Sequence, residues 1–450
     1  MMSRYIPNTD KQREDMLKEI GYTSIEELFG DIPEGVRLTG ELAVDGPMAE
    51  MELLHHMRKI ASSNKHANEY ACFLGAGAYD HYIPSAIDHI ISRAEFYTSY
   101  TPYQPEISQG TLRAIFEYQT MICELTGMDV SNASLYDGAT AVAESLLMAC
   151  QATRRNKVIV ARSLHPEYRA TAATYAKFQD IAMIEAGYKD GMIDLEALEE
   201  ALNDEVAAVI VQSPNFFGII EDIEPIARLA HENKSLLIVC ADPISLAILK
   251  SPGEAGADIV VGEGQSLGNP LSFGGPYLGF FATTRKLMRR MPGRVVGETV
   301  DRDGNRGFVL TLQTREQHIR REKATSNICT NQALNALIAT VYLSLMGKEG
   351  LKEVASQSLQ KSHYLYDRLI DTGLFTPIFS GPFFKEFALR STIPIQKLNA
   401  HLLDKGIIGG YSLEGTYPEL DGGWLLAVTE KRTREEMDAL VEGVGEIANG

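Results

Sequence analysis

The stretch from Gly256 to Ala282, GADIVVGEGQSLGNPLSFGGPYLGFFA, decides which fold the chain can adopt. A short apolar run, Ile259–Val261, enters a glycine-rich loop, and a second run, Tyr277–Ala282, leaves it. This pattern predicts a strand, a loop at the carboxyl end of that strand, and a second strand. Ligands of open α/β sheets bind at this end of the strands, and glycines let the backbone approach a bound group. Taken alone, the loop is as consistent with a plain connection between two buried strands.

Short apolar runs alternate with helical segments over residues 66–325, which we interpret as a large domain. Continuous apolar strands are typical of a sheet covered on both faces, and their alternation with helices predicts a mostly parallel, doubly wound α/β sheet. The predicted strands are Val158–Ala161, Ile181–Ile184, Val206–Val211, Leu236–Cys240, Ile259–Val261 and Tyr277–Ala282. The predicted helices are Gly138–Ala149, Glu167–Lys177, Leu195–Leu202 and Ile223–Glu232.

Two further regions flank this domain. Residues 1–65 are predicted to form a helical arm, with one helix after Thr9, a second after a capping box of Thr23 and Glu26, and a third opened by Pro47. Residues 326–450 are predicted to form a smaller α+β domain that begins with two long helices. Its segments are Asn331–Leu345, Gly350–Thr372, Phe383–Leu389, Pro394–Asp404, Ile407–Gly410, Trp424–Val428 and Thr433–Ala448.

Composition narrows the classes of function. The net charge of −18 argues against general nucleic-acid binding. The five cysteines are scattered without a CxxC pair, so we expect buried free thiols rather than disulfides or metal ligands. His55 and His56 are adjacent on a helix and do not share a face, so no metal site is predicted. The polar N-terminus and the absence of a long uncharged apolar run predict a cytoplasmic location.

Polar residues follow the ends of several predicted elements. Gly138 and Thr140 open a helix, and a helix start with free N–H groups and a hydroxyl suits a phosphate, although an ordinary N-cap is the commoner use. His165 follows the strand Val158–Ala161, and a lone histidine in a loop is usually structural. Asp242 follows Leu236–Cys240 and precedes a proline, where a turn aspartate is equally expected.

Three longer motifs carry more information than the glycine-rich loop. They are YTSYTPYQPEISQG at 97–110, QSPNFFG at 212–218 and REKATSNICT at 321–330. The first packs tyrosines and prolines into a segment that cannot be regular. An irregular, polar and aromatic segment favours a site or an interface.

On these motifs the chain resembles the glycine cleavage system P-protein family, along essentially its whole length. The resemblance implies the pyridoxal phosphate (PLP)-dependent transferase fold of aspartate aminotransferase, known as fold type I. In catalytic members the glycine-rich loop carries a His-Lys pair, and the lysine holds PLP. Matching Asp258 to the family's aspartate puts Gln265 and Ser266 at those two places. Serine has no amine and cannot form an imine.

The resemblance therefore implies a degenerate cofactor pocket. Gly138 and Thr140 stand where the family binds the cofactor phosphate, His165 where a side chain stacks on the pyridine ring, and Asp242 where a carboxylate pairs with the ring nitrogen. With Gln265 and Ser266 they make a pocket that holds no covalent PLP. No catalytic residue is assigned to this chain alone.

The resemblance also implies partners. It indicates the first, non-catalytic subunit of an α₂β₂ assembly that decarboxylates glycine and passes the aminomethyl group to the lipoyl arm of H-protein, with PLP on the second subunit. Active sites of this fold lie at the dimer interface, so two segments of this chain are expected to wall the partner's site. The residues concerned are Tyr97, Tyr100, Thr101, Tyr103, Gln104, Glu106, Ser108, Gln109, Arg321, Lys323, Ser326 and Asn327.

A basic stretch from Arg285 to Lys323 holds eleven Lys or Arg and five Asp or Glu. For any single residue a solvated surface helix and hairpin is the plainer interpretation, but the stretch as a whole suits docking of an acidic carrier protein. Two alternatives stay open. One is a self-sufficient PLP-dependent aminotransferase or decarboxylase homodimer, against which Gln265 and Ser266 speak. The other is a scaffold that only stabilises its partner.

Overall fold

The computed structural model describes residues 5–38, 40 and 42–449. The parts of the predicted arm at residues 1–4, 39 and 41, and Gly450 of the predicted small domain, lie outside the described residues. Contacts divide the chain into two compact units, Met1–Asn64 and Lys65–Gly450. Each unit is described by itself.

The described residues of the first unit form two α-helices. α1 (Asp10–Glu19) begins at the predicted cap, because the Thr9 hydroxyl accepts from the Gln12 N–H. The second predicted helix is wrong in kind: Glu26–Phe29 is a single 3₁₀ turn, and Ser24 rather than Thr23 accepts from the backbone, at the Glu27 N–H. α2 (Glu50–Ala61) begins after Ala49, so Pro47 precedes the helix and does not open it.

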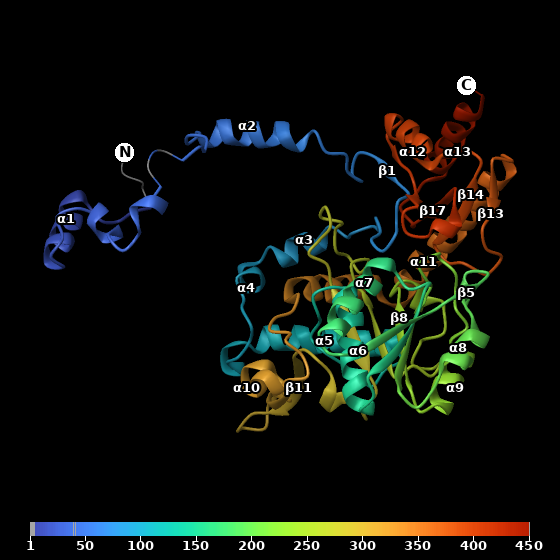
Figure 1. Cartoon of the computed structure of the whole chain (residues 1–450), viewed down its shortest axis with the longest axis horizontal. Coiled ribbons are helices and arrows are strands. Elements are labelled where there is room, and N and C mark those ends of the chain that lie inside the picture. Colours follow the sequence, from blue (N-terminus) through green and yellow to red (C-terminus); the bar gives the residue numbers. More distant parts are fainter. Residues whose placement is uncertain (1–4, 39, 41, 450) are drawn as a thin grey trace. The chain divides into compact units, whose positions relative to one another are not determined.

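A seven-stranded sheet is the centre of the second unit (Figure 1). Its order is β2-β10-β9-β8-β7-β3-β4, with the five strands from β9 to β4 parallel and β10 antiparallel to both neighbours. This confirms the predicted mostly parallel sheet. The strands are β2 (Val130–Ser131), β3 (Lys157–Ala161), β4 (Ala182–Ala186), β7 (Val206–Ser213), β8 (Leu236–Ala241), β9 (Ile259–Glu263) and β10 (Gly279–Thr283).

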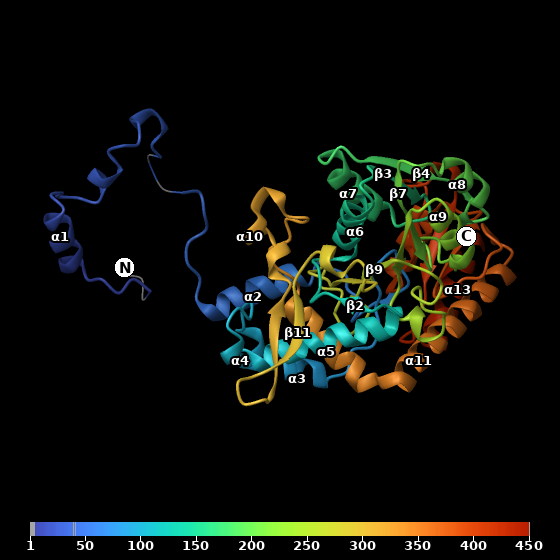
Figure 2. The same cartoon turned by 90° about the horizontal axis from the view of Figure 1, so that it is seen from below.

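Helices cover both faces of this sheet, because alternate side chains of its strands enter two separate cores. Val158 and Val160 pack with α6 (Gly138–Thr153) and α7 (Pro166–Lys177), which lie side by side in Figures 1 and 2. Ile159 points to the opposite core. That core is built with α5 (Gln109–Thr126), α8 (Leu195–Ala201), α9 (Ile223–Glu232) and the first half of α11 (Ala333–Asp371).

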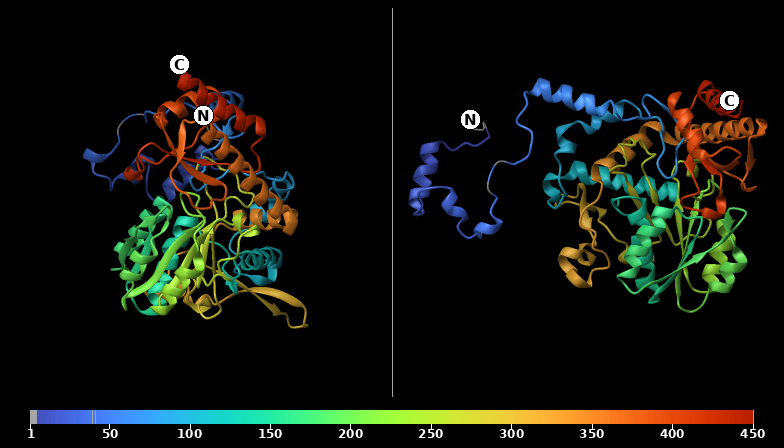
Figure 3. Two further views of the ribbon diagram at one scale, coloured as in Figure 1. Left: turned by 90° about the vertical axis from the view of Figure 1, so that its right-hand side faces the viewer. Right: turned by 45° about the horizontal axis from the view of Figure 1, so that its top comes forward.

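A smaller antiparallel sheet follows, drawn in orange and red in Figure 3. α11 leads into it and is interrupted at Gly347, where φ is +59°, so the two predicted helices are confirmed. Leu365 and Leu369 of α11 enter the core of the smaller sheet, whereas Ala336 and Ala339 enter that of the large one. The helices and strands after α11 are β13 (Phe375–Pro377), β14 (Glu386–Ser391), α12 (Ile395–Asp404), β15 (Ile407–Ile408), β16 (Tyr411–Ser412), β17 (Gly423–Ala427) and α13 (Arg434–Asn449). The domain boundaries at residues 65/66 and 325/326 stay predictions.

A β-hairpin lies beside α5, within the basic stretch where a surface helix and hairpin was the plainer interpretation (Figure 2). It consists of β11 (Val295–Val300) and β12 (Arg306–Thr311). The side chains of two glutamines of α5 hydrogen-bond to the backbone of this hairpin. The Gln109 amide exchanges both hydrogen bonds with the backbone of Phe308, each at 2.9 Å, and Gln119 does the same with Val296 at 2.9 Å. Gln109, predicted to wall the partner's site, is therefore used within the chain.

Replacing Gln119 by leucine tests whether its hydrogen bonds to Val296 stabilise the hairpin. The buried N–H and C=O of Val296 lose their partners, so we expect the free energy of unfolding to fall by about 2–4 kcal/mol in urea titrations. Glu124→Gln, an exposed change on the same helix, is the control. A loss as small as that of the control would show that the amide is not what holds the hairpin.

Candidate functional site

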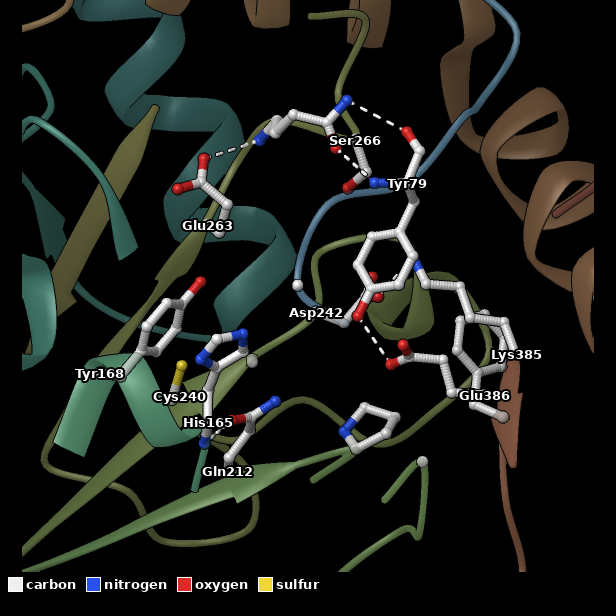
Figure 4. Close-up of a pocket in the computed structure, with 16 residues that line it drawn as sticks. Tyr79, His165, Tyr168, Gln212, Cys240, Asp242, Glu263, Ser266, Lys385 and Glu386 are labelled. Carbon is white, nitrogen blue, oxygen red and sulfur yellow. Dashed lines mark hydrogen bonds and ion pairs between the residues drawn. The ribbon is translucent and has the colours of Figure 1, made fainter. Parts of the chain in front are cut away.

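A pocket lies at the carboxyl ends of β7, β8 and β9, where the sheet topology predicts one (Figure 4). Its free volume is about 30 Å³, which is room for about two water molecules. The lining residues are Gly77, Tyr79, His165, Tyr168, Gln212, Pro214, Gly218, Cys240, Ala241, Asp242, Glu263, Gln265, Ser266, Phe384, Lys385 and Glu386. Four of them are predicted from the sequence as pocket residues: His165, Asp242, Gln265 and Ser266.

One end of the pocket is an anion-binding arrangement of backbone amides. The Glu263 carboxylate accepts from the N–H groups of Gly138 at 2.9 Å, Gln265 at 3.0 Å and Leu278 at 2.8 Å. Gly138 is the first residue of α6, and a side chain there would meet the Tyr168 hydroxyl at 2.7 Å. Glu263 thus occupies the amino end of α6, where the macrodipole favours negative charge. Burial raises its pKa to about 7.

The opposite end holds a buried ion pair. Lys385 Nζ lies 2.5 Å from the Asp242 carboxylate, and the two side chains are 2% and 12% exposed. The same ammonium donates to His81 Nε2 at 3.1 Å and lies 3.6 Å from the centroid of the Tyr79 ring. Lys385 immediately precedes β14 of the smaller sheet, and Asp242 follows β8 of the large one, so the pair joins the two sheets across the pocket (Figure 4).

Glu386 adds a second junction beside it. Its carboxylate accepts from the Tyr79 hydroxyl and from the Ala76 N–H, both at 2.7 Å. Its backbone comes close to Gly218, which has φ +87° and where a Cβ would stand 1.9 Å from the Glu386 carbonyl oxygen. Burial raises the pKa of Glu386 to about 7, with Tyr79 and Ala76 opposing the shift.

The segment 76–82 fastens the smaller sheet to the pocket. Gln265 accepts from the Tyr79 N–H at 2.9 Å and donates to the Tyr79 carbonyl at 3.1 Å. On the other side Asp80 pairs with Lys431 at 2.6 Å and Arg432 at 2.9 Å. Gln265, predicted as a residue of a degenerate cofactor pocket, is thus part of the connection between the glycine-rich loop and segment 76–82.

The other predicted pocket residues have internal partners. His165 donates from Nε2 to the Ala76 carbonyl at 2.9 Å, accepts at Nδ1 from the Glu167 N–H, and stacks on Tyr168 with centroids 4.5 Å apart. Burial lowers its pKa. The Thr140 hydroxyl bonds to Asp137, the N-cap of α6, at 2.8 Å, so it serves the ordinary capping box. Ser266 is buried in the pocket wall.

The two segments predicted to face a partner lie close to one another. The Arg294 guanidinium donates to the Tyr103 hydroxyl at 3.2 Å and to the Cys329 carbonyl at 2.5 Å, and so bridges the first segment to the end of the second. Tyr97, Tyr100 and Tyr103 are 59%, 77% and 51% exposed. Thr101 is half-buried, and Gln104 and Lys323 are exposed. The structure shows what these residues contact within the chain, and their role toward a partner stays a prediction.

A larger cavity of about 620 Å³ lies between α6, α7 and residues 322–328, with Ser326 and Asn327 in its wall. Glu144 of α6 lines it and is 2% exposed, and one of its carboxylate oxygens has no hydrogen-bond partner among the described residues. Burial raises the pKa of Glu144 to about 7, and a hydrogen bond from Ser326 opposes the shift. No feature of the sequence distinguished this glutamate from an exposed one.

Composition predicted a basic surface, free thiols and no metal site, and the structure bears on each of these. Arg294 is 7% exposed, and Arg315 donates to the carbonyls of Met291 and Gly293, so two of the eleven cations of the basic stretch serve the fold rather than a surface. All five cysteines are free, with Cys150 and Cys240 buried and Cys329 exposed. Within the described residues, no cluster of three metal-ligating side chains occurs and no helix is long and apolar enough to cross a membrane.

Comparison with known proteins decides the family. A family model described as glycine cleavage system P-protein matches residues 3–444. The chain belongs to the glycine cleavage system P-protein family. A probable glycine dehydrogenase (decarboxylating) subunit 1 from Carboxydothermus hydrogenoformans is 58% identical over 442 residues, covering 98% of this chain and 99% of the relative. One of the same name from Geobacillus kaustophilus is 56% identical over 446 residues, with 99% of each covered.

Solved structures confirm the predicted fold type. The inhibitor-bound crystal structure of a glycine decarboxylase (P-protein) superposes with a TM-score of 0.90 at 42% identity, covering 99% of this chain and 100% of that one. A sphingosine-1-phosphate lyase from Burkholderia pseudomallei superposes with a TM-score of 0.67 at 14% identity, over 94% of each chain, which shows the shared fold alone.

The pocket of this P-protein family member does not fit PLP as it stands. The cofactor's phosphate needs free amides at a helix start, but at the start of α6 the Gly138 N–H donates to Glu263 and the Thr140 N–H donates to Asp137. Its protonated ring nitrogen needs a carboxylate, but Asp242 is paired with Lys385. The free volume holds water molecules and not a substituted pyridine ring. Sequence reasoning missed Lys385, since a lysine beside a strand predicts an exposed side chain.

Replacing Glu144 by glutamine should alter the dependence of stability on pH. The folded pKa of about 7 lies above the unfolded value of 4.5, so the native state holds the proton more tightly. This carboxyl therefore stabilises the fold most below pH 4.5, and that contribution is lost as pH rises to 7. At about 1.4 kcal/mol per pKa unit, Glu144→Gln should gain up to about 3 kcal/mol over wild type between pH 4.5 and pH 8 in urea unfolding. Exposed Glu199→Gln is the control, and parallel pH profiles for wild type and Glu144→Gln would contradict the assignment.

Proposed function

We propose that this chain is subunit 1 of glycine dehydrogenase (decarboxylating), the P-protein of the glycine cleavage system. The observation that carries the proposal is its identity of 56–58% with proteins named as that subunit, over 98–99% of this chain and 99% of theirs. A serine, Ser266, in place of the loop lysine supports the assignment to the subunit that does not anchor the cofactor. In this reading the enzyme decarboxylates glycine and passes the aminomethyl group to the lipoyl arm of H-protein.

The proposal extends to partners and cofactor. The chain assembles with a second subunit, which carries PLP, as an α₂β₂ heterotetramer in the cytoplasm. PLP on that subunit supplies the electron sink for loss of CO₂. Residues of this chain bind no covalent cofactor, and they act by completing the wall of the partner's site. The exposed cations at Arg289 and Arg290 are available to a carrier protein of negative charge.

Two segments make the wall in this proposal, around Tyr97–Gly110 and Arg321–Asn327. Three features support it: the exposed tyrosines, the exposed Lys323, and the Arg294 bridge that holds Tyr103 beside Cys329. Rigid aromatic walls exclude water, and exclusion of water strengthens the attraction between a cation and the carboxylate of glycine. The self-sufficient homodimer is the alternative, and Lys385 is the lysine of the pocket that it would require.

Reconstitution with the second subunit tests both parts of the proposal. We expect glycine decarboxylation from the mixture and none from this chain alone. Tyr103→Ala or Lys323→Ala should lower kcat/KM for glycine or for the lipoyl carrier by about tenfold or more, with assembly and PLP content unchanged.

Lys250→Ala is the matched control, because Lys250 is an exposed lysine paired only with Glu224 among the interactions described. Activity of this chain alone would overturn the subunit assignment. Wild-type kinetics for both variants in a fully assembled complex would reduce the chain to a scaffold.

A further inference from the structure

The pocket contains two charged subsites, and each is filled by the chain's own side chain. At one, the N–H groups of Gly138, Gln265 and Leu278 converge on the Glu263 carboxylate within 3.0 Å. Convergent amides, one of them at the start of the 16-residue helix α6, form a site for an anion. The carboxylate that fills it comes from β9, the strand that enters the glycine-rich loop.

At the other subsite Asp242 receives a cation. The Lys385 ammonium lies 2.5 Å from its carboxylate, with the Tyr79 ring 3.6 Å away from the same nitrogen. An acidic group beside an aromatic face suits a cation or a protonated heteroaromatic ring. Both subsites open on one cavity of about 30 Å³, together with His165 and Tyr168, whose stacked rings line it (Figure 4).

We propose that Glu263 and Lys385 are built-in substitutes for the two charged ends of a phosphorylated pyridine, and that they keep such a molecule out of this subunit. The loss of the loop lysine removes only a covalent bond. A pocket with free amides and a free Asp242 would still attract the phosphate and the ring nitrogen without that bond. Glu263 and Lys385 satisfy both groups internally, so a ligand would have to displace a buried carboxylate and a buried ammonium at once.

Because an internal side chain fills each subsite, an added ligand should restore the stability that is lost when that side chain is removed. Truncating Glu263 leaves three amides without an acceptor, and truncating Lys385 leaves Asp242 buried without a cation. Each loss destabilises the fold, and each is repaired by an added group of the missing charge. The repaired pocket therefore binds a ligand that the wild type rejects.

The test uses the full chain without its partner, with pyridoxine 5′-phosphate as the probe because it has no aldehyde to react with lysine. The variants are Glu263→Ala, Lys385→Ala and the double variant. Calorimetry should detect no binding to wild type, and binding to the double variant that is tighter by at least about tenfold than that of pyridoxine or inorganic phosphate. The unfolding temperature of Glu263→Ala should rise with inorganic phosphate, and that of wild type should not.

Lys405→Ala, which breaks the exposed pair with Glu446 in the smaller sheet region, controls for loss of any ion pair. Lys385→Met keeps most of the volume without the charge, so it should lose stability and gain no ligand. A folded double variant that binds the probe no better than wild type overturns the proposal. If the double variant does not fold, the test is the folded Glu263→Ala variant. An unfolding temperature of that variant that does not change with inorganic phosphate also overturns the proposal.

The choice of probe rests on the proposed function, but the outcomes are separable. The wild-type complex can decarboxylate glycine even if the variants do not bind the probe. Conversely, binding by the variants would stand even if the complex acted on another substrate.

Discussion

The buried contact between Lys385 and Asp242 is the interaction on which the rest of the second unit depends. It joins the residue before β14 to the end of β8, and His81 and Tyr79 surround the same ammonium. Removing one partner of a buried ion pair costs about 3–5 kcal/mol, because the other charge is left without compensation. Tyr79–Glu386 and Asp80–Arg432 extend the junction, so segment 76–82 ties the smaller sheet to the glycine-rich loop.

This junction explains why a fold that commonly holds a cofactor can be stable without one. The cofactor of such a fold would link the helix start, the strand ends and the ring-nitrogen carboxylate. Here the side chains of Glu263 and Lys385 make those links, and no cofactor-like group is needed for them. In the proposed function the chemistry takes place away from this pocket, and the exposed tyrosines and cations on the other segments are the surfaces assigned to it.

The sequence predicted the sheet well and the pocket only in part. Apolar runs such as Val206–Val211 became parallel strands because burial on both faces leaves little other choice, and the break between the two predicted long helices falls at Gly347. The strands β11 and β12 were not located, since polar residues interrupt their apolar runs and the hairpin depends on Gln109 and Gln119 of a distant helix. Lys385 was missed for a similar reason. It lies 143 residues from Asp242 along the chain, and only the docking of the smaller sheet brings the two together.

The central claim is that this subunit carries no PLP because its own side chains occupy the pocket. The most direct measurement is borohydride reduction of the reconstituted complex with PLP, followed by mass spectrometric mapping of the phosphopyridoxyl label. The account predicts a label on a lysine of the second subunit and none on this chain, with or without glycine. A label on Lys385, or on any other lysine of this chain in stoichiometric amount, would contradict it.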